Sequence, residues 1–530
     1  MSRYVEGFNS SQYSFFPISL DDMIDEDNPV RGISAIVDSM DESVLKFTHS
    51  STKSTGRPPY NPISMFKMYL YCYFNGIRSS RKIERECKRN IELLWLTNSL
   101  TPDHKTIANF RKDNKKAIEA AHKEFIRIFD KLKLIGKEVV AIDGTKIRAD
   151  NSRKNNVTIN KLNKLIEYHD ENIHEYLKQL SQNDIAESTD TIKSKLKKAR
   201  EQKQKYESLK TEMESDGIRE KSLIDPDSRR MGVANKGTDV AYNVQNAVDA
   251  KEHIIVTTDV ATNPADQTQL YVMAKKTADE LNISEEEALS VLADKGYWRI
   301  DDLVECDNDK RINAVVSVPK EQGTKGFRKS DFIYDEDKDI YTCPAGNTLT
   351  RWKGKTPSYT NPKACKNCPH KDKCTKSKRG RAILRDEHEE IMESAVKRYK
   401  DNYELYRSRQ QLVEHPFGTL KRSLGFTYFL TRTLENVKNE NFLHVITYNL
   451  KRVLNIFGVP ELVERLRTFK GENDNVKSAI LLSILLIYRG ISKFSKIQMG
   501  GMTDFKAFYT VCRPQTVVLP NIKQVLTHKI

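Results

Sequence analysis

The chain has 530 residues, with 88 Lys and Arg against 73 Asp and Glu, giving a formal net charge of +15. That length exceeds one ordinary core, so we expect two to four structural units. The basic balance suits a polyanionic partner, although a basic soluble protein without such a partner has the same composition. No apolar leader is visible, and the most apolar run, 479–488, is too short to span a bilayer. We therefore expect a soluble, cytoplasmic protein with no membrane partner.

The N-terminal part, 1–130, is predicted to be helical. Apolar residues recur at helical spacing from Met65 to Phe74, Gly76 interrupts the pattern, and Asp103 is placed to cap a further helix. Short helices with basic faces are typical of a small DNA-binding or dimerisation domain, and equally of a plain packing domain. We interpret 1–130 as a DNA-binding or dimerisation domain.

The next elements alternate between strands and helices. An apolar strand, 138–142, ends at Asp143, and a Lys-, Glu- and Gln-rich stretch with periodic Leu and Ile predicts an exposed helical hairpin. Further elements follow in the order strand, strand, helix, strand, helix, strand and long helix, at 240–248, 253–260, about 266–281, 289–293, 300–306, 312–318 and around Glu414.

Without its insertions, this is the element order of the RNase H-like fold, a mixed five-stranded sheet with flanking helices. We therefore predict an α/β, RNase H-like catalytic domain over 137–458. It would carry a helical hairpin at 155–215 and a cysteine-bearing insertion at 325–385. A helical C-terminal tail of unassigned role would follow at 459–530.

Three acidic residues stand at corresponding points of this order. Asp143 and Asp294 close two strands, and Glu414 lies on the late helix. A single strand-end Asp is more often a turn cap than a ligand, but three acids in the order of the fold predict a metal site. Two Mg²⁺ (or Mn²⁺) ions held by carboxylates can activate a nucleophile and neutralise a phosphate. We expect Asp143 to bridge both ions, and Asp294 and Glu414 to complete one each.

Cations surround Glu414 in the sequence. Lys421 lies two helical turns beyond Glu414, on nearly the same face, where it could hold a phosphate beside the metal ions. Arg409 and Arg422 are further candidates for DNA contacts, although such charges are often a solvated helix face. Pro416 predicts a kink or a restart of the helix.

Four cysteines gather in a short span: Cys343, Cys365, Cys368 and Cys374, with His370 as a spare ligand. Their spacing makes them a candidate structural Zn²⁺ site. The surrounding segment has no evident core of its own, so a metal would stabilise it. The alternative is four reduced, unmetallated thiols. The other cysteines are predicted to be ordinary buried residues: Cys72, Cys87, Cys306 and Cys512.

Several motifs follow one another along the chain: GRPPY at 56–60, PDHKTIANFR at 102–111, IDGTK at 142–146, ADKGY at 293–297 and VEHPFGTLKR at 413–422. Together they resemble DDE-type transposases of bacterial insertion sequences, in the subgroup with a cysteine-bearing insertion before the catalytic Glu helix. The resemblance covers about 55–455.

The resemblance implies a catalytic triad of Asp143, Asp294 and Glu414 and metal-dependent DNA nicking and strand transfer. It also implies double-stranded DNA partners, namely terminal inverted repeats and target DNA, and a homodimer or larger synaptic complex at a prokaryotic nucleoid. Relatives carry a Tyr and an Arg upstream of the Glu, where this chain has Arg407 and Gln410; Arg409 is the nearest substitute.

Two other functions remain open. The fold could serve a catalytically silent DNA-binding protein, or a non-transposing RNase H-like nuclease.

Overall fold

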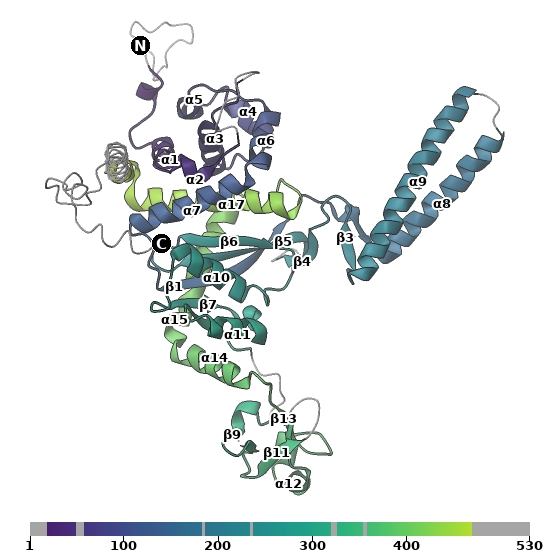
Figure 1. Ribbon diagram of the computed structural model, residues 1–530, viewed down its shortest axis with the longest axis vertical. Coiled ribbons are helices and arrows are strands. Elements are labelled where there is room, and N and C mark those ends of the chain that lie inside the picture. The colour runs from purple at the N-terminus through teal and green to yellow at the C-terminus, as the bar shows by residue number, and fades with distance from the viewer. Residues whose placement is uncertain are drawn as a thin grey trace, which may run out of the picture. The chain divides into compact units, whose positions relative to one another are not determined.

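The computed structural model describes residues 19–48, 58–182, 186–233, 237–319, 326–352 and 358–468. The chain divides into two units, Met1–Pro460 and Glu461–Ile530, and almost all described residues belong to the first (Figure 1). The predicted helical tail beyond residue 468, including Cys512, lies outside the described residues.

Short helices make up the described N-terminal part. α3 is its central helix: it begins where the Asn61 side chain accepts backbone N–H groups, and every residue from Met65 to Tyr73 except Lys67 is buried. Asp103 caps α6, as its sequence predicts. The helices are α1 (Pro29–Asp38), α2 (Glu42–Leu45), α3 (Pro62–Phe74), α4 (Ser80–Glu86), α5 (Ile91–Thr97), α6 (His104–Asp113) and α7 (Lys115–Lys131).

A mixed sheet forms the centre of the first unit. Its strands are β1 (Val139–Arg148), β4 (Arg229–Val233), β5 (Gly237–Asp249), β6 (Ile255–Ala261), β7 (Leu289–Ala293) and β8 (Ile312–Val316). β1 pairs antiparallel with β5 on one side and parallel with β7 on the other. β6 pairs antiparallel with β5, and β8 parallel with β7. The neighbour order is therefore β6-β5-β1-β7-β8.

The sheet has six strands, where the sequence predicts five. The additional strand, β4, pairs antiparallel with the first residues of β5, next to the stretch that pairs with β6. Only Met231 and Val233 of its five residues are large and apolar. Its pairing with β5, rather than a hydrophobic pattern, makes it a strand.

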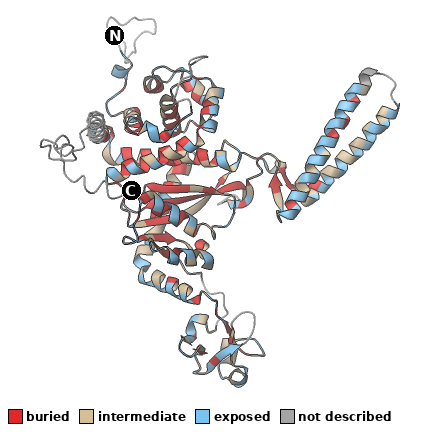
Figure 2. Ribbon diagram, in the orientation of Figure 1, coloured by how far each residue is buried: buried red, intermediate tan, exposed pale blue. Residues whose placement is uncertain are grey.

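Helices cover both faces of the sheet. Alternate residues of a strand point to opposite faces, and two neighbours on β1 show which helix lies where. Thr145 contacts Lys421, which follows α16 (Arg409–Gly418), whereas Lys146 pairs with Asp266, which precedes α10 (Leu270–Leu281). Figure 2 shows the buried residues concentrated on the strands and on the helix sides that face them.

The remaining helices of the sheet domain complete these two layers. α17 (Leu434–Phe457) packs on the same face as α16, because its Val437, Val445 and Tyr448 share one core with Tyr242 and Val248 of β5. α11 (Ile300–Asn308) packs on α10 and β8, and α14 (Glu389–Asp401) and α15 (Tyr403–Arg407) lead to α16.

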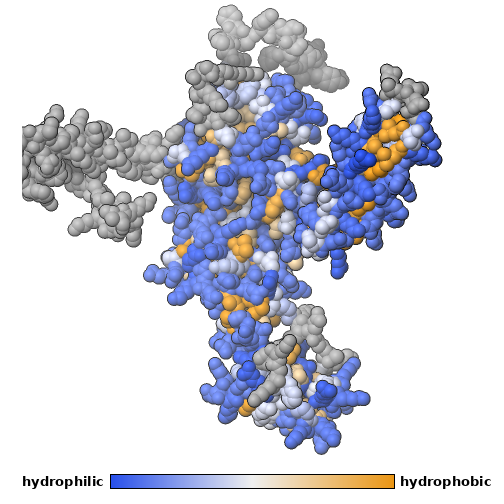
Figure 3. All heavy atoms as spheres, turned by 45° about the vertical axis from the view of Figure 1, so that its right-hand side comes forward, coloured by the Kyte–Doolittle hydropathy of each residue, from blue (hydrophilic) through white to orange (hydrophobic). Residues whose placement is uncertain are grey.

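A long helical hairpin, α8 (Ile159–Gln182) and α9 (Ala186–Ser215), follows β1. A small antiparallel pair, β2 (Asn156–Thr158) and β3 (Glu220–Ser222), stands at its base. Val157, Leu162 and Met213 give this region a core of its own. Most of the described surface visible in Figure 3 is hydrophilic, with hydrophobic residues in separate small patches.

The cysteine-bearing insertion forms a second, antiparallel sheet, so the expectation that it lacks a core is wrong. Four of its five short strands each bury one residue, and these residues form one compact core with Phe332, which precedes β9: Phe332, Tyr341, Leu349, Tyr359 and Ile383. The strands are β9 (Ile333–Asp335), β10 (Ile340–Thr342), β11 (Thr348–Trp352), β12 (Ser358–Thr360) and β13 (Ala382–Leu384), with helices α12 (Pro362–Lys366) and α13 (Lys371–Cys374) between β12 and β13.

Candidate active site

Two of the three predicted acids lie side by side. The parallel register of β1 and β7 pairs Val139 with Ser290 and Ala141 with Leu292. The same offset places Asp143 opposite Asp294, the first residue after β7. Neighbouring strands are about 4.8 Å apart, and residues in register share a face. The sheet therefore brings Asp143 and Asp294 together, and we call this pair the aspartate site.

Asp143 does not end its strand, which corrects the expectation from the sequence. β1 continues to Arg148 because β5 pairs with it along that whole stretch. β7, in contrast, pairs only with Val139–Ala141. In the described part of the chain, the β7 side of β1 has no further strand partner until Arg148 meets Tyr428. Asp143 thus lies where an open strand edge begins.

The environment of Asp143 concentrates negative charge. The pKa of Asp143 is raised to about 6, mainly by burial and also by the nearby carboxylates of Asp294 and Asp266. Two contacts act in the opposite direction: the Arg409 guanidinium, 3.9 Å away, and the backbone N–H of Gly144, which donates to Oδ1. Carboxylate oxygens are the donors that a hard divalent cation prefers.

Lys421 also lies at this site. α16 continues directly into a π-helical turn, Thr419–Ser423, and the Lys421 ammonium donates a hydrogen bond to Thr145 Oγ1. Thr145 is two residues beyond Asp143 and shares its face of the sheet. Burial lowers the pKa of Lys421, and the charge of Asp143 raises it. π-Helical turns often occur at functional sites.

Glu414 lies on the same helix but faces away. Leu412 and Val413 of α16 are buried against the sheet, whereas Glu414 is exposed and accepts a hydrogen bond of 2.8 Å from Gln410 Nε2. The α16 residue at Asp143 is Arg409. Among the described residues, no group of three or more His, Cys, Asp or Glu side chains stands close enough to hold a metal ion.

The sequence suggests that Glu414 and Lys421 share one face of a helix, but in the structure they do not. The π-helical turn that follows α16 explains the difference. The π-helical turn winds more slowly than an α-helix, so it changes the direction in which Lys421 projects. Pro416 does not end the helix, which runs on to Gly418. The Leu412 carbonyl, which Pro416 deprives of its helical N–H donor, is hydrogen-bonded by His253. The helix break falls earlier, at Ser408.

Asp266 is a third carboxylate at the site, and the sequence analysis missed it. Its Oδ1 accepts hydrogen bonds from Lys146 Nζ at 2.9 Å, Asn243 Nδ2 at 2.7 Å and Gln245 Nε2 at 2.8 Å. In sequence it reads as a turn residue before a helix. The available signal was β5, where polar Asn243 and Gln245 interrupt an apolar strand, because buried amides require partners.

The two other residues predicted to contact DNA, Arg409 and Arg422, differ in their exposure to solvent. Arg409 is engaged with Asp143, and its side chain is 15% exposed. Arg422, next to Lys421, is exposed.

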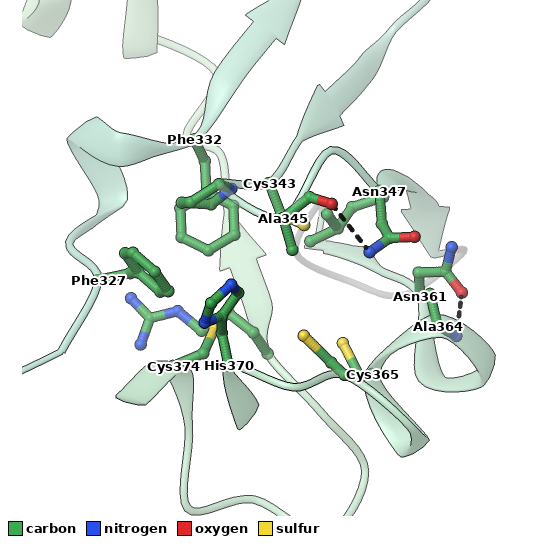
Figure 4. A pocket seen from close by; sticks show the side chains of 14 residues that line it. Phe327, Phe332, Cys343, Ala345, Asn347, Asn361, Ala364, Cys365, His370 and Cys374 are labelled. Atoms are coloured by element: carbon green, nitrogen blue, oxygen red, sulfur yellow. Dashed lines mark hydrogen bonds between the residues drawn. The ribbon is translucent and has the colours of Figure 1, made fainter. Parts of the chain in front are cut away.

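The four cysteines of the insertion line one small cavity of about 30 Å³, with His370 beside them (Figure 4). Cys343 follows β10, Cys365 belongs to α12, Cys368 follows α12, and Cys374 ends α13. All four are free thiols. Burial raises the pKa of the Cys374 thiol, and the three other cysteines add to that effect.

Comparison with known protein families identifies the class. A model described as a transposase domain (DUF772) matches residues 18–113, and a model described as a transposase DDE domain matches residues 342–454. The first covers α1–α6, and the second runs from the cysteines through Glu414 into α17. Two separate parts of the chain thus match transposase domains. The two matches support a DDE-type transposase of the insertion-sequence type, which confirms the family that the motifs predict.

Other comparisons add little. No curated protein matches the chain. A cryo-EM structure of a piggyBac transposase synaptic complex with hairpin DNA is similar at 10% sequence identity, over 93% of this chain and 87% of that chain. Its TM-score of 0.28 does not establish a shared fold. Among the described helices, none has the length and apolar run needed to cross a membrane.

Proposed function

We propose that the chain is a metal-dependent DNA transposase built on an RNase H-like core. It binds double-stranded DNA at the terminal inverted repeats of its own element, nicks the DNA there and joins the freed end to target DNA. The order β6-β5-β1-β7-β8, with β5 and β6 antiparallel to β1 and β7 and β8 parallel to it, supports this fold.

The observation that carries the proposal is the aspartate site itself. The register of β1 and β7, continued two residues past its last pair, brings Asp143 beside Asp294, and the Lys421 ammonium stands beside the same stretch of β1. Two bound Mg²⁺ or Mn²⁺ ions would supply activation of the attacking oxygen and neutralisation of the phosphate. Asp143, Asp294 and Glu414 would hold them, and Lys421 would contact the phosphate.

Arg409 and Glu414 differ in how they stand at the site. The Arg409 guanidinium supplies Asp143 with positive charge at 3.9 Å. Glu414 lies at the surface, where it accepts a hydrogen bond from the Gln410 amide, so its side chain would have to turn toward the strands to hold an ion. Arg409 and Arg422 would contact DNA phosphates.

The chemistry needs no nucleotide cofactor. Water oxygen attacks the phosphorus at the element end, the P–O3′ bond breaks, and the 3′-oxygen leaves as a hydroxyl. That 3′-hydroxyl then attacks a phosphorus of the target strand, forming one phosphodiester bond as another breaks. A homodimer or larger synaptic complex, associated with the prokaryotic nucleoid in the cytoplasm, would hold the two ends and the target together.

Replacement of Asp143 by Asn tests the proposal. We expect D143N to lose Mg²⁺-dependent cleavage of a DNA fragment that carries the element ends, because the amide lacks the charge that holds the ions. Binding of the same fragment, measured by gel shift, should persist. D259N, which alters a β6 carboxylate paired with Lys276 and Lys438, is the matched control and should still cleave.

Three results separate the alternatives. Undiminished cleavage by D143N contradicts the proposed site. A wild-type protein that binds the ends and never cuts them, with any divalent ion, is a silent DNA-binding protein. Cut ends that are never joined to a second DNA identify a nuclease.

We also propose that the four cysteines bind one structural Zn²⁺. The supporting observation is that four free thiols, from three separate chain segments, line a single small cavity, where they would have to move closer together to bind one ion. Four sulfur donors suit a closed tetrahedral zinc site, and the thiols release their protons on binding.

A further inference from the structure

Asp266 is held in place from the side of the sheet opposite Asp143. Its Oδ1 is saturated by three donors, Lys146, Asn243 and Gln245. Gln245 is itself fixed, since its Oε1 accepts a hydrogen bond from the hydroxyl of the fully buried Tyr297. In the described structure no hydrogen bond is donated to Asp266 Oδ2. One oxygen of this carboxylate thus anchors it, and the other is available.

The backbone leaves room for Asp266 to reach the aspartate site. A Cβ at Gly144 would lie 2.8 Å from Asp266 Oδ1 and 2.3 Å from Gln245 Nε2, so only glycine fits there. Gly144 directly follows Asp143 and lies on the open edge of β1. Because no strand covers that edge, groups above and below the sheet can meet around it.

Asp266 also approaches Asp294. A Cβ built at Gly296 would lie 2.9 Å from Asp294 Oδ1 and 4.0 Å from Asp266 Oδ2. The two oxygens are therefore at most 6.9 Å apart, the sum of those distances. Two ions about 3.5–4 Å apart, each about 2.1 Å from its oxygens, can be bound by ligand oxygens that are up to about 8 Å apart. Asp266 Oδ2 lies within that span.

Electrostatics agree with this placement. The charges of Asp266, Asp143 and Asp294 together raise the pKa of Tyr297, after burial, and Asp266 contributes to the raised pKa of Asp143. Asp266 therefore interacts electrostatically with Asp143, and all three carboxylates act on Tyr297, although in this structure the three are not drawn together into one metal-binding group.

We propose that Asp266 is a further metal ligand of the active site, contributing Oδ2 from the α10 side while Asp143 contributes from the α16 side. This inference rests on the proposed metal-dependent function. In this arrangement, the hydrogen bonds that Lys146, Asn243 and Gln245 donate to Asp266 Oδ1 would hold the carboxylate in place before any ion binds.

Calorimetric titration of the full chain with Mn²⁺, without DNA, tests the inference independently of activity. D266N retains an oxygen to accept the three hydrogen bonds but lacks the carboxylate charge. We expect its Mn²⁺ affinity to fall by about 10-fold or more, in the range seen when metal-site partners are removed. D143N should show a comparable loss, and the control D259N none.

K146M tests whether Asp266 acts only by holding Lys146. If Asp266 binds the ion, K146M should lower Mn²⁺ affinity less than D266N does, because Asn243 and Gln245 still hold the carboxylate, whereas a loss equal to that of D266N overturns the inference. Normal Mn²⁺ binding by D266N, alongside a loss in D143N, overturns it too and leaves the proposed function intact. Failure of the wild-type protein to bind Mn²⁺ at all overturns both.

Discussion

At Asp143, burial and the neighbouring carboxylates disfavour the ionised form, which is the form that would bind a metal ion. Its pKa is about 6 in the folded, metal-free protein, against about 3.9 in an unfolded chain. The folded state therefore holds this proton more tightly. The contribution of this proton to the free energy of unfolding is fully present below about pH 4 and is lost as the pH rises to about 6. Above that pH, the ionised group costs at most about 3 kcal/mol.

This cost predicts that D143N stabilises the metal-free protein. In EDTA at pH 7.5, its thermal midpoint should exceed that of the wild type, because the neutral amide escapes the cost of a buried charge. The difference should shrink as the pH is lowered toward 4.5, where the wild-type carboxyl is protonated. Melting curves of both proteins across that range measure it. A difference that does not change with pH contradicts the account.

At the scale of single residues, the sequence predicted positions better than contacts. Asp143 and Asp294 could be found because each follows an apolar run, and parallel strands place such residues together. Asp266 was missed, because the polar Asn243 and Gln245 of β5 indicate that a buried partner exists but not which residue it is. The contact of Arg409 with Asp143 depends on the break at Ser408, which sets the direction in which α16 side chains project.

Among the elements, β1 contains a position that only glycine can occupy. Gly144 lies in the middle of this strand, where an added Cβ would meet Gln245 and Asp266. Gly232 lies in β4, where a Cβ would meet nothing within 4 Å.

This contrast predicts different effects for the same substitution. G144A should lower stability by about 1–3 kcal/mol, the usual cost of forcing a group into a filled space, and should weaken Mn²⁺ binding by displacing Asp266. G232A should be neutral or slightly stabilising, since alanine has less freedom to lose on folding. Thermal melting and Mn²⁺ titration of both variants measure this. Equal effects of the two substitutions would contradict the close packing at Gly144.

The larger elements were predictable where burial imposes a pattern. The apolar, β-branched runs of β5, β6, β7 and β8 and the periodicity of α10 gave their order. β4 and the strands of the cysteine-bearing insertion were not predictable in this way. They are three to five residues long, and three residues are too few to show an alternating pattern.

Across the whole molecule, the insertions have their own cores. The cysteine-bearing insertion packs around Tyr341, Tyr359 and a few other buried side chains, a core too small to be stable without help. A bound Zn²⁺ would supply that help.

Zinc analysis of the purified chain should find one ion per molecule, and C365S should lose it. C306S, at a buried cysteine of α11, is the control and should keep the zinc. After chelation, hydrogen exchange should accelerate at 327–385 while β1 and β7 remain protected, because their packing is independent of the insertion. A purified wild-type protein that contains no zinc, or a C365S variant that retains zinc, would contradict the proposed zinc site.

The strand order also determines when the site can exist during synthesis. Asp143 and Lys421 are 278 positions apart in the sequence, so a ribosome adding about 5–20 residues per second needs about 15–55 s to pass from one to the other. β7, which pairs with β1, is made about halfway through that interval, so the two aspartates can come together before α16 exists. Under the proposed function, a chain interrupted between Asp294 and α16 would carry both aspartates but lack Glu414 and Lys421, so it would be unable to cut DNA.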